Sequence, residues 1–230
     1  MREIVFDTET TGLDPEQGDR LVEIGCIELI NRFPTGNTFH RYVNPERDVP
    51  EPAFRVHGLS SEFLKDKPRF HEIADELAEF LGEAPLVAHN AMFDLGFLNA
   101  ELRRAGKAPV QRERLIDTLL LARRKHAGSN SLDSLCERYQ IDNSRRTKHG
   151  ALLDAELLAE VYLELLGARQ AALGLVETTI STGTISVENI LRARAQPLTI
   201  RITDDERDEH RKFIATLGDG ALWRHYLPEN

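Results

Sequence analysis

Cysteine and long apolar runs are both scarce in this chain of 230 residues. Its two cysteines, Cys26 and Cys136, are too few for a disulfide scaffold or a cysteine-rich zinc site. No apolar run approaches the roughly 18 residues that a membrane-spanning helix needs. The residues after Met1 begin a strand-like run and do not resemble a signal peptide. We therefore expect a cytoplasmic protein.

Positive charge is also in short supply, since 29 lysines and arginines face 38 acidic residues, for a net charge of −9. Such a chain gains little from counterion release on binding nucleic acid. Residues 101–149 differ, with 12 basic and 6 acidic residues. This basic segment fits either a phosphate-facing patch or a solvated helix face. If the protein handles nucleic acid, we expect it to bind weakly and to rely on a partner.

The remaining composition is that of a globular protein, with 41% apolar and 29% charged residues. Apolar runs predict strands at residues 4–6, 21–30, 38–43, 85–89 and 115–117. Apolar residues at helical spacing predict helices at 70–81, 93–102, 119–124, 132–136 and 151–166. We interpret residues 31–37 as a hairpin turn and 49–52 as a proline-rich loop. This order of elements predicts an α/β domain with a mixed sheet over residues 1–166.

The sequence changes in character after residue 166. Residues 177–187 are small and polar, so we interpret 167–196 as a flexible linker. A strand is expected at 198–202 and a charged helix from Asp204 to about Leu217. This last β-α segment, 197–230, is too small to be stable alone, so its apolar side chains need a partner surface.

Asp7 and Glu9 follow the first apolar strand with one residue between them. Residues at this spacing point to the same face of a strand, so the two carboxylates can meet. A buried acidic pair calls for a cation or a shared proton, because burial disfavours bare charge. The pattern alone also fits a solvated strand end.

Two further acids lie near helix starts. Asp94 follows the strand at 85–89, where a surface acid stabilised by the helix dipole is the alternative interpretation. Asp154 lies among the apolar positions of the helix at 151–166. On one continuous helix His149 and Asp154 would point about 140° apart. We therefore expect His149 on the preceding loop, which suits a proton-transfer group.

Convergence of Asp7, Glu9, Asp94 and Asp154 would require cations. Two carboxylates about 5 Å apart repel by roughly 3 kcal/mol at an effective dielectric of about 20. Oxygen ligands suit Mg²⁺ or Mn²⁺ rather than Zn²⁺. A pair of such ions binds the attacking and leaving oxygens of a phosphodiester, and a neighbouring histidine can accept the proton of the attacking water.

Three motifs resemble those of the DEDD exonuclease superfamily. They are residues 7–13 (DTETTGL), 89–94 (HNAMFD) and 149–154 (HGALLD), and a histidine five residues before the last aspartate resembles the DEDDh branch. Further similarity at residues 56–58, 130–133, 142–154 and 222–224 makes the chain most like the epsilon subunits of bacterial DNA polymerase III. The resemblance implies a ribonuclease-H-like mixed five-stranded sheet flanked by helices, and a proofreading 3′–5′ exodeoxyribonuclease of the bacterial replisome.

The resemblance also implies roles for individual residues. Asp7, Glu9 and Asp154 would hold one of two divalent ions, Asp7 and Asp94 the second, and His149 would be the general base. The substrate contacts implied, beside Asp7, Glu9 and Asp154, are Thr10, Thr11, Gly12, Leu13, His57, Asn90 and Phe93. Backbone N–H groups of residues 10–13 would meet the sugar and phosphate, and Leu13 would wedge between bases. His57 would contact the terminal phosphate or sugar, with a locally bonded loop histidine as the alternative. Relatives often carry an acid where this chain has Pro52, which leaves the role of that position open.

Two partner sites are implied in the last part of the chain. Residues 170–175 (QAALGL) resemble a short sliding-clamp-binding motif, with Gln170, Leu173 and Leu175 as the contacts. The alternative is that both leucines simply extend the preceding helix. The segment 197–230 would dock on the alpha subunit of the polymerase. No membrane contact is expected.

Two other functions remain open from the sequence alone. A DEDDh exoribonuclease would share the motifs, although compact RNA-trimming members lack the extra tail seen here. A catalytically silent scaffold between clamp and polymerase would share the tail, although all five active-site residue types are present. Digestion of matched DNA and RNA oligonucleotides separates these possibilities.

Overall fold

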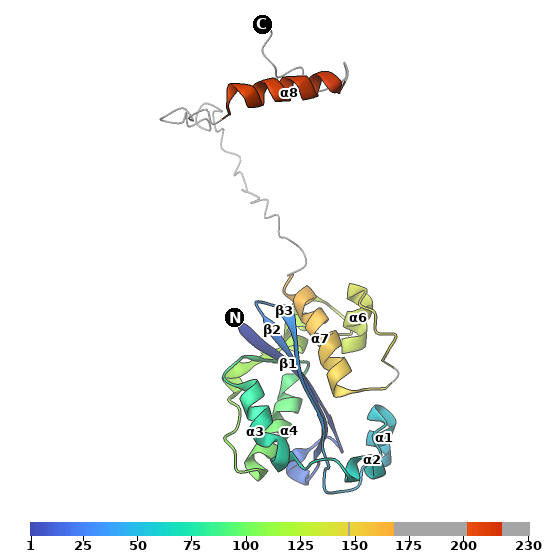
Figure 1. Cartoon of the computed structure of the whole chain (residues 1–230). Helices are drawn as coiled ribbons and strands as arrows, with labels where there is room; N and C mark the ends of the chain where they lie inside the picture. The colour runs from blue at the N-terminus through green and yellow to red at the C-terminus, as the bar shows by residue number, and fades with distance from the viewer. Residues whose placement is uncertain (147, 168–201, 218–230) are drawn as a thin grey trace, which may run out of the picture. The chain divides into compact units, whose positions relative to one another are not determined.

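The computed structural model describes residues 1–146, 148–167 and 202–217 (Figure 1). The chain divides into one unit of residues 1–174 and a second of residues 175–230. The expected linker after Gly167, the clamp motif at 170–175 and the expected strand up to residue 201 lie outside the described residues. These expectations therefore stay predictions.

Five strands form one mixed sheet in the order β3-β2-β1-β4-β5. The strands are β1 (Arg2–Thr10), β2 (Leu21–Ile30), β3 (Phe33–Tyr42), β4 (Leu86–Ala88) and β5 (Leu115–Asp117). Strand β2 runs antiparallel to both β1 and β3, while β4 runs parallel to β1 and β5 parallel to β4. The mixed sheet expected from the order of elements is confirmed.

Helices cover both faces of this sheet. On one face lie α3 (Phe70–Leu81) and α4 (Ala91–Arg104), and on the other lie α5 (Thr118–Lys125), α6 (Leu132–Tyr139) and α7 (Ala151–Leu165) (Figure 1). Strand β1 divides its side chains between these two cores, because alternate residues point to opposite faces. Ile4 and Phe6 pack on the α3 and α4 side, whereas Val5 packs on the α7 side.

The turn between β2 and β3 is shorter than the sequence predicted. Strand β3 already begins at Phe33, and the turn consists of Asn31 and Arg32, whose φ angles are 51° and 70°. Two residues with positive φ form the turn that suits the twist of a hairpin. The expected turn over residues 31–37 was wrong because Pro34 lies on an edge strand, where a missing N–H is tolerated.

The segment expected as a proline-rich loop contains a helix start. Helix α1 (Glu51–His57) has Pro52 in its first turn, where the missing N–H of proline costs no hydrogen bond. A second short helix, α2 (Ser61–Lys65), follows, capped by the Ser60 side chain. Two short 3₁₀ helices, η1 (Pro15–Gln17) and η2 (Arg112–Arg114), complete the first unit.

Helix α7 lies unusually close to β2 at Gly25. A Cβ atom at this position would overlap the backbone of Ala151 and Leu152 in the first turn of α7. Gly25 is paired with Asp7 in the sheet. The absent side chain therefore lets the first turn of α7, which carries Asp154, lie over the carboxyl end of β1.

The described part of the second unit is one helix, α8 (Asp204–Thr216), as expected. Thr203 and Glu206 form a reciprocal capping box at its first turn. Across the described residues of both units, no helix is long and apolar enough to cross a membrane. Cys26 and Cys136 are both buried and unpaired.

Candidate active site

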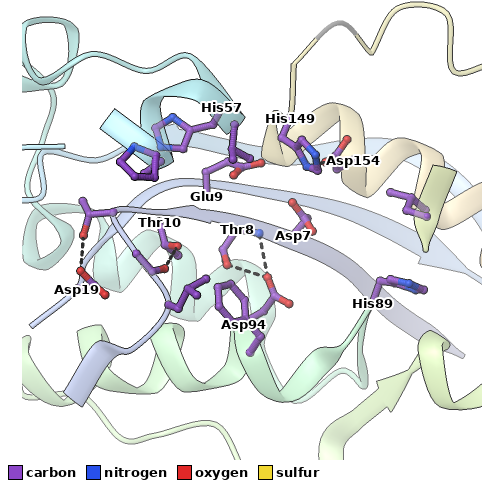
Figure 2. A pocket seen from close by; sticks show the side chains of 18 of the residues that line it. Asp7, Thr8, Glu9, Thr10, Asp19, His57, His89, Asp94, His149 and Asp154 are labelled. Carbon is purple, nitrogen blue, oxygen red and sulfur yellow. Dashed lines mark hydrogen bonds and ion pairs between the residues drawn. The ribbon is translucent and has the colours of Figure 1, made fainter. Parts of the chain in front are cut away.

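A cleft of about 690 Å³ lies at the carboxyl end of β1 (Figure 2). Asp7 and Glu9 of β1, Asp94 of α4 and Asp154 of α7 all line it, together with His149. The four acids and the histidine, which are distributed over almost 150 positions of the chain, therefore meet in one cleft.

Asp94 is a buried residue, so its interpretation as a surface acid was wrong. Its side chain reaches across to β1, where Oδ1 accepts hydrogen bonds from the Thr8 hydroxyl at 2.7 Å and the Thr8 N–H at 3.1 Å. Only 3% of Asp94 is exposed. Thr8 thus fixes the orientation of this carboxylate beside Asp7 and Glu9.

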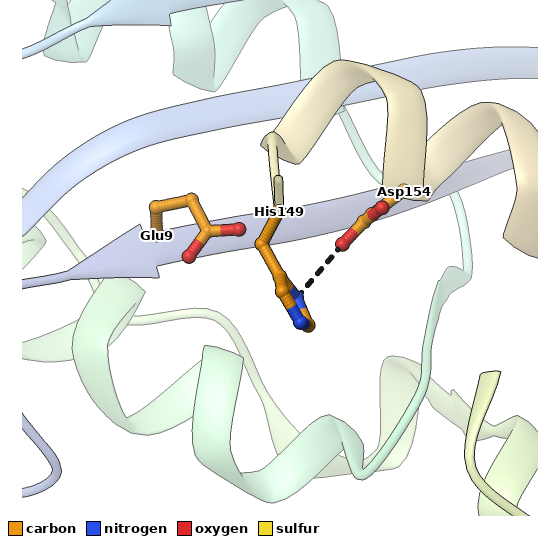
Figure 3. A group of neighbouring side chains, drawn as sticks. All are labelled: Glu9, His149 and Asp154. Atoms are coloured by element: carbon orange, nitrogen blue, oxygen red, sulfur yellow. Dashed lines mark ion pairs between the residues drawn. The ribbon is translucent and has the colours of Figure 1, made fainter. Parts of the chain in front are cut away.

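His149 lies on the loop before α7, as predicted. The helix begins at Ala151 with Gly150 as its N-cap, and the imidazole turns back toward the first turn (Figure 3). Its Nδ1 lies 3.2 Å from Oδ2 of Asp154. Glu9, His149 and Asp154 each offer a ligand atom within 4.8 Å of the others, the one such group of three in the described part of the chain.

An arginine that the sequence reasoning missed lies among these carboxylates. Arg146 donates from Nε to Oδ1 of Asp154 at 2.6 Å and from Nη2 to Oδ2 at 2.7 Å. Its Nη1 donates to Asp133 at 2.7 Å, and its Nη2 also contacts Nδ1 of His149 at 2.7 Å. The residue belongs to the basic segment noted above, but nothing in the local pattern distinguishes it from Arg145.

Burial strongly perturbs the acids of the cleft. It is the largest cause that raises the pKa of Asp7 well above its ordinary range and that of Glu9 to about 8, and neighbouring carboxylates add to both shifts. Burial also raises the pKa of Asp94 to about 7, against the hydrogen bonds from Thr8. The cleft therefore disfavours further negative charge and favours a cation.

Asp154 behaves differently from the other three acids. Burial acts to raise its pKa, but the hydrogen bonds and charges of Arg146 and His149 together lower it. The pKa of Arg146 is raised in turn, chiefly by its hydrogen bond to Asp154. Asp154 is thus the carboxylate that already has a cationic partner.

Residues 10–13 form one wall of the cleft, and their positions agree in part with the substrate contacts expected for them. Thr10, Thr11, Gly12 and Leu13 all line the cleft, and Leu13 is 84% exposed. However, the Thr11 N–H donates to the carbonyl of Arg20 at 2.8 Å. That backbone group is not free for a substrate, because the residue after β1 is hydrogen-bonded to the residue before β2.

His57 lines the cleft from the end of α1 and is only 5% exposed. Its Nδ1 accepts a hydrogen bond from the Leu59 N–H at 3.0 Å, so the locally bonded interpretation holds for one ring nitrogen. Its Nε2 is buried and makes no hydrogen bond of normal length among the described residues. Burial lowers the pKa of the imidazole, which favours the neutral ring.

The beginning of α4 contributes a different pair from the one predicted. Phe93 lines the cleft, but Asn90 does not, and His89 does. Asn90 adopts a left-handed conformation, and its N–H donates to Asp117 at 3.2 Å. Its implied substrate contact has no support in this geometry.

Several cleft residues had little or no individual signal in the sequence. They are Asp19, Pro50, Pro52, Ala53, Val56, Ser131, Leu132, Asp133 and Arg146. Of these, five lie in segments that carry the family resemblance: Val56, Ser131, Leu132, Asp133 and Arg146. Pro52 gives the wall an apolar surface. The clamp-motif residues Gln170, Leu173 and Leu175 lie outside the described residues.

Comparison with known proteins agrees with this architecture. The profile of a family described as Exonuclease (RNase_T) matches residues 4–162. The DNA polymerase III subunit epsilon of Rickettsia felis is 49% identical over 222 residues, which are 94% of this chain and 97% of that protein. The same subunit of Escherichia coli K12 is 42% identical over 236 residues, which are 97% of each chain.

Solved structures show the same fold. Exonuclease X in complex with 5′ overhanging duplex DNA aligns with a TM-score of 0.57 and 26% identity over 72% of this chain and 92% of that chain. Exonuclease I aligns with a TM-score of 0.65 and 18% identity over 74% of this chain and 41% of that one. The ribonuclease-H-like exonuclease fold is thus confirmed, and exonucleases of this family use divalent metal ions. The chain belongs to the exonuclease family and, within it, to the epsilon subunits of DNA polymerase III, and it is a 3′–5′ exonuclease.

Proposed function

We propose that this exonuclease removes mispaired nucleotides from the 3′ end of DNA by hydrolysis with two divalent ions, Mg²⁺ or Mn²⁺. The observation that carries the proposal is the meeting of four carboxylates and His149 in one cleft at the end of β1. The similarity over nearly the whole chain to proteins named DNA polymerase III subunit epsilon supports DNA as the substrate.

The donor set fits hard divalent cations. Asp7, Glu9 and Asp154 would hold one ion, and Asp7 with Asp94 the second. Carboxylate oxygens are the ligands that Mg²⁺ and Mn²⁺ favour. The raised pKa values of Asp7, Glu9 and Asp94 support this assignment, because a bound cation would relieve the unbalanced negative charge. When bound, the ions would neutralise phosphodiester oxygens and acidify a water molecule.

His149 is the general base in this proposal. It lies on a loop at the cleft, 48% of its side chain is exposed, and its Nδ1 contacts Asp154. A histidine imidazole in this position can accept a proton from a water molecule in the cleft. Asp154 would stabilise the imidazolium that forms.

The other cleft residues would hold the strand end without regard to base identity. Leu13 is exposed at the rim and would wedge against a base, while Phe93 offers an aromatic face. The buried Nε2 of His57 would contact the terminal phosphate or sugar. Mispaired ends would be preferred because a mispaired terminal base is cheaper to separate from its template.

Partners would compensate for the net charge of −9. In this proposal residues 1–166 form the nuclease domain, and residues 197–230 dock on the polymerase alpha subunit. Residues 170–175 would bind the sliding clamp. Such a tether raises the local concentration of a weakly binding nuclease at the DNA end. The exonuclease would act at the replisome in the bacterial cytoplasm.

Digestion of 5′-labelled single-stranded DNA by the full chain tests the function. With Mg²⁺ or Mn²⁺ we expect a ladder that shortens from the 3′ end and disappears with EDTA. His149→Ala should also remove it, because the general base is lost. An RNA oligonucleotide of the same sequence is the second arm, and a strong preference for RNA would refute the proposal.

A further inference from the structure

The guanidinium of Arg146 lies inside the carboxylate cluster (Figure 2 draws the surrounding acids). Its side chain is only 8% exposed, although arginine is normally a surface residue. It engages both oxygens of Asp154, at 2.6 Å and 2.7 Å. These are the oxygens that would face a divalent ion shared with Glu9. The guanidinium and the metal ion would therefore compete for the same carboxylate.

The two cations are incompatible in this arrangement. A divalent ion bound to Asp154 would lie within a few ångströms of the guanidinium, and like charges at such distances repel strongly in a buried site. The pair with Asp154 is also of the bidentate kind that is among the stronger hydrogen-bonded ion pairs in proteins. A metal ion must therefore displace the arginine before it can use Asp154 fully.

Asp133 gives the displaced guanidinium a second position. It already accepts a hydrogen bond from Nη1 of Arg146 at 2.7 Å. The Asp133 side chain lines the cleft and is 59% exposed, so an arginine held there can remain solvated. Departure from Asp154 would also break the contact between Nη2 and Nδ1 of His149.

We propose that Arg146 is an internal counter-cation of the active site, which competes with the divalent ion for Asp154 and moves toward Asp133 when the ion binds. This inference rests on the proposed metal-dependent function. Arg146 is then a positioning residue, because it holds Asp154 and His149 in order until the ion arrives. Because Arg146 occupies Asp154, the site has a weaker affinity for the divalent ion.

Titration of the full chain with Mn²⁺, in the absence of DNA, tests the competition. In Arg146→Gln we expect the Mn²⁺ dissociation constant to fall about tenfold, within the usual range for coupling between two sites. The matched control is Arg145→Gln, which removes one charge from the neighbouring position, where the side chain is 72% exposed and pairs with Glu156. The control should bind Mn²⁺ within about twofold of the parent, because exposed charges are screened.

Thermal unfolding supplies a second measurement. Arg146→Gln should melt at a lower temperature than the parent in EDTA, because the carboxylates lose their counter-cation, and Mn²⁺ should raise its melting temperature by more than it raises that of the parent. Arg146→Lys keeps the charge but cannot form the bidentate pair, so its Mn²⁺ affinity should rise by less than that of Arg146→Gln. This variant replaces Arg146→Gln in the titration if the glutamine variant does not fold.

The sign of the change in Mn²⁺ affinity shows whether Arg146 competes with the ion for Asp154. Weaker binding by Arg146→Gln would overturn the competition and make Arg146 a support of the metal site. A folded parent that binds no Mn²⁺ would overturn the proposed metal function and this inference together. Binding by the parent with no gain in the variant would overturn this inference alone.

Discussion

Gly25 of β2 and Leu152 of α7 approach each other so closely that a Cβ atom on the glycine would overlap the leucine backbone nitrogen. Gly25 is also the sheet partner of Asp7. One missing side chain therefore brings the helix that carries Asp154 over the strand that carries Asp7 and Glu9. The active site depends on this contact between two backbones.

Gly25→Ala adds only one methyl group but should disturb the active site strongly. The added methyl group must push α7 away from β2, which we expect to lower the free energy of unfolding by about 1–3 kcal/mol and to reduce cleavage of DNA severely. Urea unfolding and nuclease assays measure the two effects. Gly96→Ala is the control, since its Cβ would meet only a side-chain atom of Pro15 at 3.9 Å. Full activity in Gly25→Ala would contradict the expected role of the close approach.

Asp7→Asn should abolish cleavage while stabilising the metal-free protein. Asp7 is the acid whose pKa is raised by burial and by all three neighbouring carboxylates, so its charge destabilises the folded state near neutral pH. We expect the free energy of unfolding in EDTA to rise, because the neutral amide removes a buried negative charge. Cleavage by the variant would refute Asp7 as a metal ligand, and a lower melting temperature in EDTA would refute the electrostatic account.

The metal-free protein should lose stability as the pH rises from about 5 to 8. Glu9 has a pKa of about 8 in the folded chain, against 4.5 for an ordinary glutamate. Between these values the folded state binds more protons than the unfolded state, so the free energy of unfolding falls with pH. Melting temperatures in EDTA from pH 5 to pH 9 measure the slope, and Glu9→Gln should flatten it. A melting temperature that rises through this window in the parent would show that another group dominates.

His57→Ala should weaken action on DNA without loss of the fold. The Nε2 of His57 is buried in the cleft wall without a hydrogen bond of normal length, so the substrate is its expected partner. A hydrogen bond to a charged group is worth about 1.5–3 kcal/mol, which corresponds to a loss of roughly 10- to 150-fold in kcat/KM. The exposed His71→Ala is the control. An unchanged kcat/KM in His57→Ala would leave only the local bond to Leu59 as its role.

Removal of residues 187–230 should spare the nuclease and abolish binding to the polymerase alpha subunit. The sheet, the cleft and every acid of the site lie within the first unit, residues 1–174. Nuclease assays and co-purification with the alpha subunit test the two halves of this prediction. Binding that survives the deletion would put the docking surface on the nuclease domain.

The sequence alone determined much about this protein. Helical spacing predicted 70–81 to the residue, and the alternation of side chains on a strand predicted that Asp7 and Glu9 share a face. The 140° separation on an ideal helix predicted that His149 lies on a loop. These are local properties, because the backbone geometry of a single element sets the direction of each side chain.

Only the tertiary structure decided the features that depend on contact between distant elements. Asp94 lies 86 positions from Thr8 along the chain, and its burial follows from the packing of α4 against β1. The pairing of Arg146 with Asp154 and Asp133 needs α6, α7 and their connecting loop to meet, and no spacing distinguishes Arg146 from Arg145. The close approach at Gly25 is of the same kind. A pattern along the chain records which way a side chain points, whereas the packing of separate elements decides what it meets.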